Sequence, residues 1–274
     1  MMRHMRFQAI LLVLAVVIPG LTGCSGSQST HTSGNSKLTS DTSSSSSPEE
    51  IKDDKETSEA SSEGDANKQK EDSDMATLLY QGHGSLRITT KEGKVVYIDP
   101  YAGEGYDAPA DLILVTHAHQ DHTAIDKIGT QNPGCETITY KEALENGEHK
   151  IFELGFVTVE AVQAGNNQGH DIRECVGYIL TLSDGKTIYA SGDTSTTEQM
   201  ATLAARGLDY AFFCCDGRYN MDIAEAVACT NLVGAKHSIP YHMAPGELFS
   251  MERAEQFDVE NRMIVPAGEA FVIE

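Results

Sequence analysis

A dense cluster of metal-binding side chains constrains this chain more than any other feature of its sequence. Residues 112–115 form a short apolar run, which predicts a strand buried on both faces. The run leads into His117-Ala-His119-Gln-Asp121-His122. Imidazoles and a carboxylate packed together at the end of a buried strand suit zinc, iron or manganese. The fold must therefore present this loop at the edge of a sheet.

The spacing inside the cluster indicates two metal sites rather than one. His117 and His119 alternate with Ala118, so both imidazoles can point in the same direction. Asp121 and His122 come after a turn and can face a second ion.

This cluster resembles the His-X-His-X-Asp-His signature of the metallo-β-lactamase superfamily, and the resemblance extends over residues 76–274. It implies an α/β fold, the metallo-β-lactamase αββα four-layer sandwich. The order of the expected elements agrees, because strands come first, mixed strands and helices follow, and no dinucleotide-binding fingerprint is present. In that family the remaining metal ligands are a distant histidine, then an aspartate, then a last histidine.

Two histidines lie between the cluster and the expected aspartate. His149 sits in a polar turn ahead of a strand, which is an ordinary surface position. His170 lies in a glycine-bearing loop after the expected strand 157–162, where such folds place ligands. We therefore expect His170 to be the third histidine of the first metal. The segment Asp171-Ile-Arg-Glu follows it in place of the family's usual proline- and glycine-bearing segment.

The last two ligands are expected at Asp193 and His242. Asp193 follows the expected strand 187–190 and precedes a helix, so helix capping is the alternative role. The resemblance favours a carboxylate that bridges both metals. His242 ends an Ile-Pro-Tyr-His segment that fits the family pattern, whereas His237, earlier on the same strand, is expected to be a buried or rim histidine.

The assembled site holds two divalent cations, with zinc expected first and manganese or iron as alternatives. One ion is expected on His117, His119 and His170, and the other on Asp121, His122 and His242, with Asp193 bridging. Two divalent ions would lower the pKa of a bridging water, giving a hydroxide that attacks an ester, lactone, amide or phosphoester bond. Asp121 is the expected catalytic proton acceptor.

Four further motifs resemble the ascorbate-phosphate-lactonase-like group of metal-dependent hydrolases. They are Gln81-Gly-His83-Gly-Ser85, Ile98-Asp-Pro-Tyr101, Gly192-Asp-Thr194 and Asp216-Gly-Arg-Tyr-Asn-Met221. Within them, His83 is either a rim residue of the site or a structural histidine. Arg218 and Tyr219 are candidates for substrate contact. The motifs indicate the metal chemistry far better than the substrate, which is expected to be a small molecule.

The first part of the chain predicts export. Residues 1–24 read as a signal peptide, with two arginines, a short apolar run and a Leu-Thr-Gly-Cys end that resembles the lipobox of bacterial lipoproteins. Lipidated Cys24 would anchor an extracytoplasmic protein in the membrane. Residues 25–74 contain 15 serines and 12 acidic residues, which predicts a disordered tether. Residues 75–274 form the expected hydrolase domain.

Charge bears on the choice of partners. The whole chain has a net charge of −21, and the expected domain is itself strongly acidic. Such a domain would repel phosphate backbones, so no nucleic-acid partner is expected. The alternative function is a membrane-tethered binding or sensing lipoprotein without turnover; the full set of seven ligands favours the enzyme. The sequence leaves the oligomeric state open.

The remaining expectations concern local structure. Strands are expected at 77–80, 85–89, 95–98, 112–115, 157–162, 176–182, 187–190, 208–215, 237–242, 263–265 and 270–273, and helices at 197–206, 221–232 and 251–257. Five cysteines lie in the domain, so they cannot form a complete set of disulfides. We expect packing roles for them, including the adjacent Cys214 and Cys215.

Overall fold

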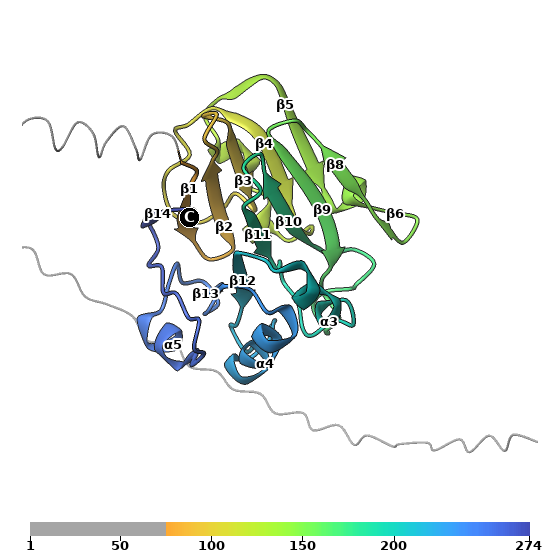
Figure 1. Cartoon of the computed structure of the whole chain (residues 1–274), viewed down its shortest axis with the longest axis vertical. Helices are drawn as coiled ribbons and strands as arrows, with labels where there is room; N and C mark the ends of the chain where they lie inside the picture. Colours follow the sequence, from red (N-terminus) through yellow and green to blue (C-terminus); the bar gives the residue numbers. More distant parts are fainter. Residues whose placement is uncertain (1–74) are drawn as a thin grey trace, which may run out of the picture. The chain divides into compact units, whose positions relative to one another are not determined.

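Two six-stranded sheets pack face to face in the computed structural model, which describes residues 75–274 (Figure 1). The strand orders are β14-β1-β2-β3-β4-β5 and β13-β12-β11-β10-β9-β8. This arrangement confirms the α/β sandwich. The signal peptide and tether expected at 1–24 and 25–74 lie outside the described residues.

The elements have the following bounds. The first sheet contains β1 (Thr77–Gly82), β2 (Ser85–Thr89), β3 (Val95–Ile98), β4 (Ala110–Val115), β5 (Gln131–Thr139) and β14 (Ala270–Val272). The second contains β8 (Ile151–Glu153), β9 (Val157–Gln163), β10 (Val176–Leu182), β11 (Thr187–Ala190), β12 (Tyr210–Cys214) and β13 (His237–Tyr241). A small hairpin joins β6 (Leu144–Glu145) to β7 (Glu148–His149). The helices are α2 (Tyr140–Ala143), α3 (Met200–Leu203), α4 (Ile223–Val233) and α5 (Met251–Gln256), with 3₁₀ turns η1 (Gln120–His122), η2 (Ile125–Lys127) and η3 (Ala204–Arg206).

The central strands of the first sheet are buried on both faces. On β3, Val96 and Ile98 join the main core between the sheets, while Val95 and Tyr97 join a smaller cluster that includes Ile113 of β4. All six residues of β4 are buried, as its continuous apolar run predicted. The outer cluster is covered by the loop after β3 and by η2, so 3₁₀ and loop segments form this outer layer of the sandwich.

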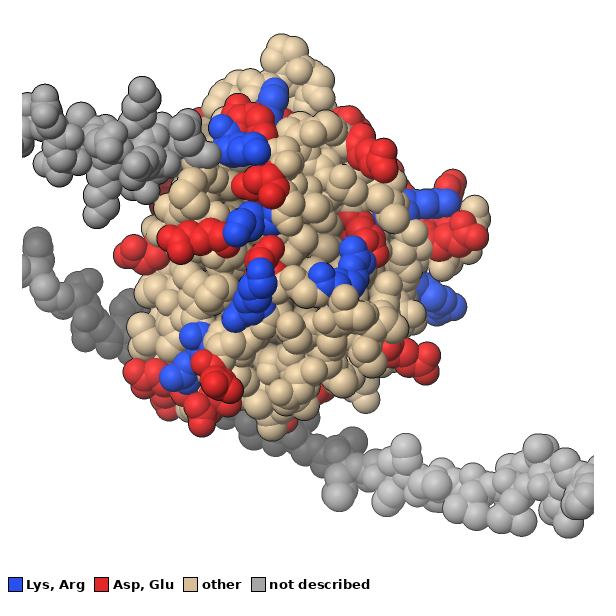
Figure 2. All heavy atoms as spheres, in the orientation of Figure 1, with Lys and Arg blue, Asp and Glu red and all other residues tan. Residues whose placement is uncertain are grey.

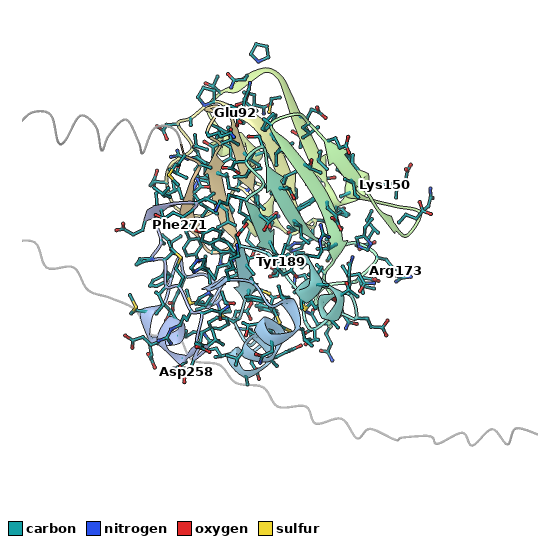
Figure 3. All side chains as sticks on the ribbon, in the orientation of Figure 1. Glu92, Lys150, Arg173, Tyr189, Asp258 and Phe271 are labelled. Carbon is teal, nitrogen blue, oxygen red and sulfur yellow. The ribbon has the colours of Figure 1, made fainter. Side chains whose placement is uncertain are left out.

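Helices α3 and α4 pack against each other beside the second sheet, and α4 also contacts β12. Helix α4 begins after Asp222, whose side chain accepts a hydrogen bond from the backbone N–H of Glu225, and ends at Gly234 in the left-handed conformation (φ 62°). Its bounds agree with the expected helix 221–232 to within two residues. Figure 3 shows side chains filling the space between the sheets, with Tyr189 inside.

Several local expectations were wrong. The helix expected at 197–206 consists of the short α3 and η3, and residues 263–265 form no strand. Strand β5 was missed because it contains Pro133 and Gly134, which are tolerated at the edge of a sheet. Cys214 and Cys215 are buried as predicted, and all five described cysteines are free.

Charged side chains of both signs share the surface. On the face drawn in Figure 2, Lys and Arg side chains alternate with Asp and Glu without a continuous basic patch. Within residues 75–274, every helix is too short or too polar to cross a bilayer.

The strand ends explain where a site can form. Strand β4 runs parallel to β3, and β11, β12 and β13 are parallel to one another. The carboxyl ends of parallel neighbours meet at one edge of each sheet. Those ends lead directly into Asp99, His117, Asp193 and His242.

We predict that Asp209 stabilises the second sheet in a pH-dependent manner. Its carboxylate accepts hydrogen bonds from the Thr187 N–H (2.8 Å), the Thr187 hydroxyl (3.0 Å) and Lys236 Nζ (2.7 Å), which joins the start of β11 to the segments before β12 and β13. Burial raises the pKa of Asp209, but the hydrogen bonds from Lys236 and Thr187 outweigh it and hold the pKa below the usual value of 3.8. Its contribution is therefore complete above that value and is lost as the pH falls through the depressed pKa.

Asp209→Asn should lower the free energy of unfolding at pH 7 by about 1 to 2 kcal/mol. In urea titrations, the difference from the wild type should shrink below about pH 4. Asp258→Asn, at an exposed carboxylate after α5 (Figure 3), is the control and should have little effect. A destabilisation by Asp209→Asn that is the same at pH 7 and pH 3 would contradict this role.

Candidate metal centre

The seven expected ligands come together in the folded chain. They form two main groups, and the donor atoms within each group lie within 4.8 Å of one another. The first group is His117, His119 and His170, and the second is His83, Asp121, His122 and His242. Asp193 groups with His117 and His122.

Asp193 lies between the two groups. Its Oδ2 atom is 3.3 Å from His170 Nε2 and 3.4 Å from His242 Nε2, and its Oδ1 atom is 3.4 Å from His122 Nε2. One carboxylate therefore faces imidazoles of both groups. This is the geometry that a bridging ligand requires, and Asp193 lies in a bend rather than at the start of α3.

Hydrogen bonds on the outer side orient His117 and His122. Thr116 Oγ1 is 3.0 Å from His117 Nδ1, and Asp99 Oδ2 is 2.8 Å from His122 Nδ1. Asp99 also accepts from the Thr116 hydroxyl (2.6 Å) and N–H (2.8 Å), so one buried carboxylate fixes both ends of the cluster. These contacts leave Nε2 of each ring directed inward.

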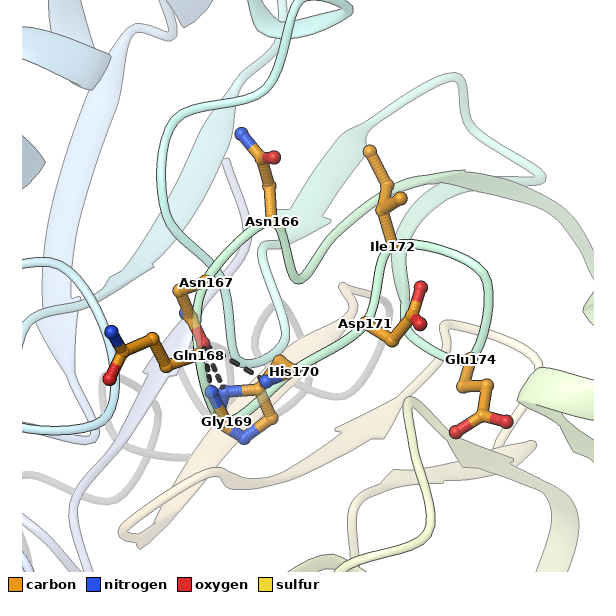
Figure 4. Close-up of a pocket in the computed structure, with 8 residues that line it drawn as sticks. All are labelled: Asn166, Asn167, Gln168, Gly169, His170, Asp171, Ile172 and Glu174. Atoms are coloured by element: carbon orange, nitrogen blue, oxygen red, sulfur yellow. Dashed lines mark hydrogen bonds between the residues drawn. The ribbon is translucent and has the colours of Figure 1, made fainter. Parts of the chain in front are cut away.

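Asn167 orients His170 in the same manner (Figure 4). Its Oδ1 atom accepts from the N–H groups of Gly169 and His170 and lies 3.1 Å from His170 Nδ1. His170 Nε2 is then 3.2 Å from His119 Nδ1. The competing candidate, His149, lies in β7 outside both groups.

Several donor atoms that point into the cluster lack hydrogen-bond partners, and this bears on whether the site fits cations. His117 Nε2, His122 Nε2, His242 Nε2 and Asp193 Oδ1 are buried, and each is without a hydrogen bond. Buried polar atoms normally have partners because their desolvation is costly. Nitrogen and carboxylate oxygen donors that converge in this way suit zinc and its first-row neighbours. The residues therefore fit divalent ions.

The charges of the site follow from this crowding. Burial raises the pKa of Asp193, but the surrounding imidazoles, His242 first, hold it far below the usual range. Burial, reinforced by the charge of His122, lowers the pKa of His117 to about 2. Asp193 is thus an anion and His117 a neutral donor, which are the forms that bind metals.

His83 belongs to the cluster, a placement that the sequence left open. It is buried, its Nε2 atom is 3.1 Å from Asp121 Oδ2, and its ring centroid is 3.7 Å from that of His242. The hydrogen bond from His83 is the main cause that holds the pKa of Asp121 well below its usual range. The contact with His83 therefore fixes the orientation of the Asp121 carboxylate.

The backbone around the cluster is held in an uncommon conformation. His83, Asp99 and His242 have φ angles of 50°, 47° and 44°, in the left-handed region that side chains rarely adopt. The His242 N–H donates to the His83 carbonyl (2.9 Å), which ties the two strained positions together. At Gly84 an added Cβ would lie 2.8 Å from His122 Cε1, so only glycine leaves room for that ring.

A cavity of about 220 Å³ opens onto the cluster. Tyr219 lines it beside His119 and Asp121, and the Arg218 guanidinium lies over the Tyr219 ring at 4.9 Å. Tyr219 therefore forms part of the cavity wall beside the candidate ligands. His237 is exposed at the start of β13 and stacks on Tyr210, so the expectation of a buried or rim position was wrong.

Sequence reasoning missed the residues that orient the ligands. Besides Asp99 and Asn167, these include Asn220, whose Nδ2 donates to Asp193 (2.9 Å) and to Asp216 (2.8 Å). Asp216 Oδ2 in turn lies 3.5 Å from His242 Nδ1. The sequence shows Asp99 and Asn220 only as parts of longer motifs, which do not reveal which ligand each supports.

Comparisons with known proteins identify the family. The family described as "Beta-lactamase superfamily domain" matches residues 77–242. The chain is 29% identical over 197 residues to a UPF0173 metal-dependent hydrolase of Pyrococcus furiosus, covering 61% of this chain and 84% of the relative.

Two solved structures share the fold of this chain. A proposed metal-dependent hydrolase of Parabacteroides distasonis is 26% identical, with a TM-score of 0.58 over 70% of this chain and 92% of its own. Igni18, a metallo hydrolase of Ignicoccus hospitalis, is 20% identical and shows the same fold, with a TM-score of 0.56 over 73% of this chain and 99% of its own. The chain therefore belongs to the family described as "Beta-lactamase superfamily domain". It is a metal-dependent hydrolase of the metallo-β-lactamase superfamily.

Proposed function

We propose that the protein is a dinuclear hydrolase that holds two divalent ions, with zinc as the first expectation and manganese or iron as alternatives. The observation that carries this proposal is the position of Asp193 between two groups of inward-facing donors. His117, His119 and His170 would hold one ion, and Asp121, His122 and His242 the other, with Asp193 shared. The unpartnered inner nitrogens of both groups support two ions rather than one.

The proposed reaction is hydrolysis of an ester, lactone, amide or phosphoester bond in a small molecule. When bound, the ions would activate water near neutral pH and stabilise negative charge that develops on the substrate. Asp121 lines the cavity and would accept the proton, while the contact between its Oδ2 atom and His83 orients the carboxylate. Tyr219 covers the cavity and would orient the substrate. An ascorbate-phosphate-lactonase-like activity is one member of this proposed range.

We also propose that residues 1–24 direct export, that Cys24 is lipidated, and that residues 25–74 tether the hydrolase domain 75–274 to the outer side of the membrane. The support is the signal-like first segment and the serine-rich acidic composition of the second. A flexible coil of 50 residues would have a root-mean-square span of about 40 Å. The enzyme would then reach substrates near the membrane surface.

The first test is metal content. Elemental mass spectrometry of the chain purified without chelator should find about two ions per chain. His170→Ala should reduce this to about one, because it removes one donor of the first group only. His149→Ala is the matched control and should retain both ions. Two ions in His170→Ala, or loss of metal in His149→Ala, would contradict the assignment of His170.

The second test concerns Asp121. Asp121→Asn should lower kcat by about a hundredfold or more on any substrate that responds in a screen of lactones, phosphodiesters and β-lactams, because the proton acceptor is lost. The ion held by His117, His119 and His170 should remain, as measured by metal content. Unchanged turnover would exclude Asp121 as the catalytic base. Metal binding without turnover on any substrate class would favour a binding or sensing protein.

The third test concerns the anchor. Cys24→Ala should move the protein from the membrane fraction to the soluble extracytoplasmic fraction and abolish labelling by a radioactive fatty acid. Specific activity of the hydrolase domain should be unchanged, since Cys24 lies outside it. Retention of the variant in the membrane fraction would refute lipid anchoring through this residue.

A further inference from the structure

A second pocket adjoins the metal centre and shares His83 with it. Its volume is about 390 Å³, and its walls include His83, Tyr101, Ala124, Lys127, Glu247 and Leu248. We propose that this pocket, named here the Tyr101–Leu248 pocket, binds an uncharged aromatic or aliphatic group of the substrate. Tyr101 and Leu248 are then the residues that determine specificity. This inference rests on the proposed hydrolytic function and names the class of substrate.

The pocket and the metal centre are neighbours that meet at one pair of contacting residues, His83 and Asp121. His83 lines the Tyr101–Leu248 pocket, and its Nε2 atom contacts Asp121 Oδ2 at 3.1 Å. Asp121 lines the 220 Å³ cavity over the metal ligands. The His83 and Tyr101 ring centroids are 5.9 Å apart. A substrate whose reacting bond lies at Asp121 therefore has this pocket directly beside it.

The walls of the pocket are built from segments that leave the metal centre. Tyr101 follows Asp99 by two residues, and Leu248 follows His242 by six. The backbone carbonyl of Leu248 accepts hydrogen bonds from the His83 N–H (2.8 Å) and the Tyr80 hydroxyl (3.2 Å). The Tyr101 N–H donates to Ser85 Oγ (3.1 Å) and to the Tyr106 hydroxyl (2.9 Å). Both walls are fixed before any ligand arrives, so little ordering entropy is lost on binding.

The chemistry of the walls favours an uncharged ligand group. Tyr101 and Leu248 are 42% and 50% exposed, so two of the six exposed large hydrophobic side chains among the described residues line this one pocket. Lys127 Nζ donates to the carbonyls of Tyr101 (2.8 Å) and Gly103 (3.0 Å) and lies over the Tyr106 ring, so two of its three donors already have partners. Glu247 adds a negative charge at the pocket and disfavours an anion.

The sizes of the two cavities suit a substrate that is divided between them. The 220 Å³ cavity must accommodate the reacting bond beside two ions, which leaves little space for the rest of a substrate. A cavity of about 150 Å³ is enough to hold a benzene ring. The 390 Å³ pocket therefore has room for an aromatic ring or a short branched chain.

The test uses two metal-binding probes that differ only in their apolar group. Acetohydroxamate and benzohydroxamate share the group that chelates divalent ions, so both should bind the full chain loaded with zinc. Isothermal titration calorimetry should show that benzohydroxamate binds about tenfold more tightly, because its ring is buried in the pocket. Tyr101→Ala and Leu248→Ala should reduce this preference to about threefold or less, and acetohydroxamate affinity should be unchanged.

Three further variants keep the result interpretable. Leu248→Phe narrows the pocket without removing apolar surface, so it should weaken benzohydroxamate binding and spare acetohydroxamate. Ile151→Ala, at an exposed position on β8, should leave the affinities of both probes unchanged. Tyr219→Ala alters the other cavity, where Tyr219 is 49% exposed, and should preserve the preference between the probes.

The outcomes separate the pocket from the proposed function. Equal affinity for the two probes in the wild type, or a preference that is lost in Tyr219→Ala and kept in Tyr101→Ala, would overturn the Tyr101–Leu248 pocket while the dinuclear centre stands. A chain that takes up no zinc and binds neither probe would overturn the dinuclear proposal, and the pocket proposal with it.

Discussion

A buried carboxylate surrounded by imidazoles dominates this structure. Asp193 is almost fully removed from solvent, and its oxygens face His122, His170 and His242 at 3.3 to 3.4 Å. A charge in that position is tolerated only when several groups compensate its desolvation. The surrounding chain meets this need by pointing the inner nitrogens of both groups toward it. The arrangement is costly as a structural core and well suited to cations.

The centre also depends on how the two sheets meet. His117, Asp121 and His122 follow β4 of the first sheet, whereas Asp193 and His242 follow β11 and β13 of the second. Backbone hydrogen bonds cross between these parts, from the Val176 N–H to the Thr116 carbonyl (2.9 Å) and from the His242 N–H to the His83 carbonyl. A small slip of one sheet against the other would separate the donors, so packing of the main core sets the geometry of the site.

Much of this architecture is visible in the sequence because it depends on local signals. Short-range patterns determine the apolar runs of β3 and β4, the alternation in β2 and the helix that Asp222 and Gly234 delimit. Strand β5 escapes prediction since its pairing with β4 comes from tertiary contact and overrides Pro133.

The same distinction applies to the site. The resemblance indicated seven candidate ligands, which cluster in the fold, but the residues that orient them were not apparent. His83 and Asn167 reach their ligands only through the left-handed turn at His83 and the folding of the loop that carries His170. A sequence records which side chains are present, whereas hydrogen-bond direction requires coordinates.

The division of the donors between two sheets has a consequence for how the protein matures. Neither half of the chain can present a complete set of donors, so a partly folded chain has no high-affinity place for an ion. Metal would be acquired late, after the sheets dock, in whatever compartment the chain completes its folding. Because first-row metals compete for the same nitrogen and oxygen donors according to affinity and supply, the ion pool of that compartment would decide which element the enzyme carries. With the proposed export, that pool would be the surroundings of the cell, and the enzyme's metal would vary with its habitat.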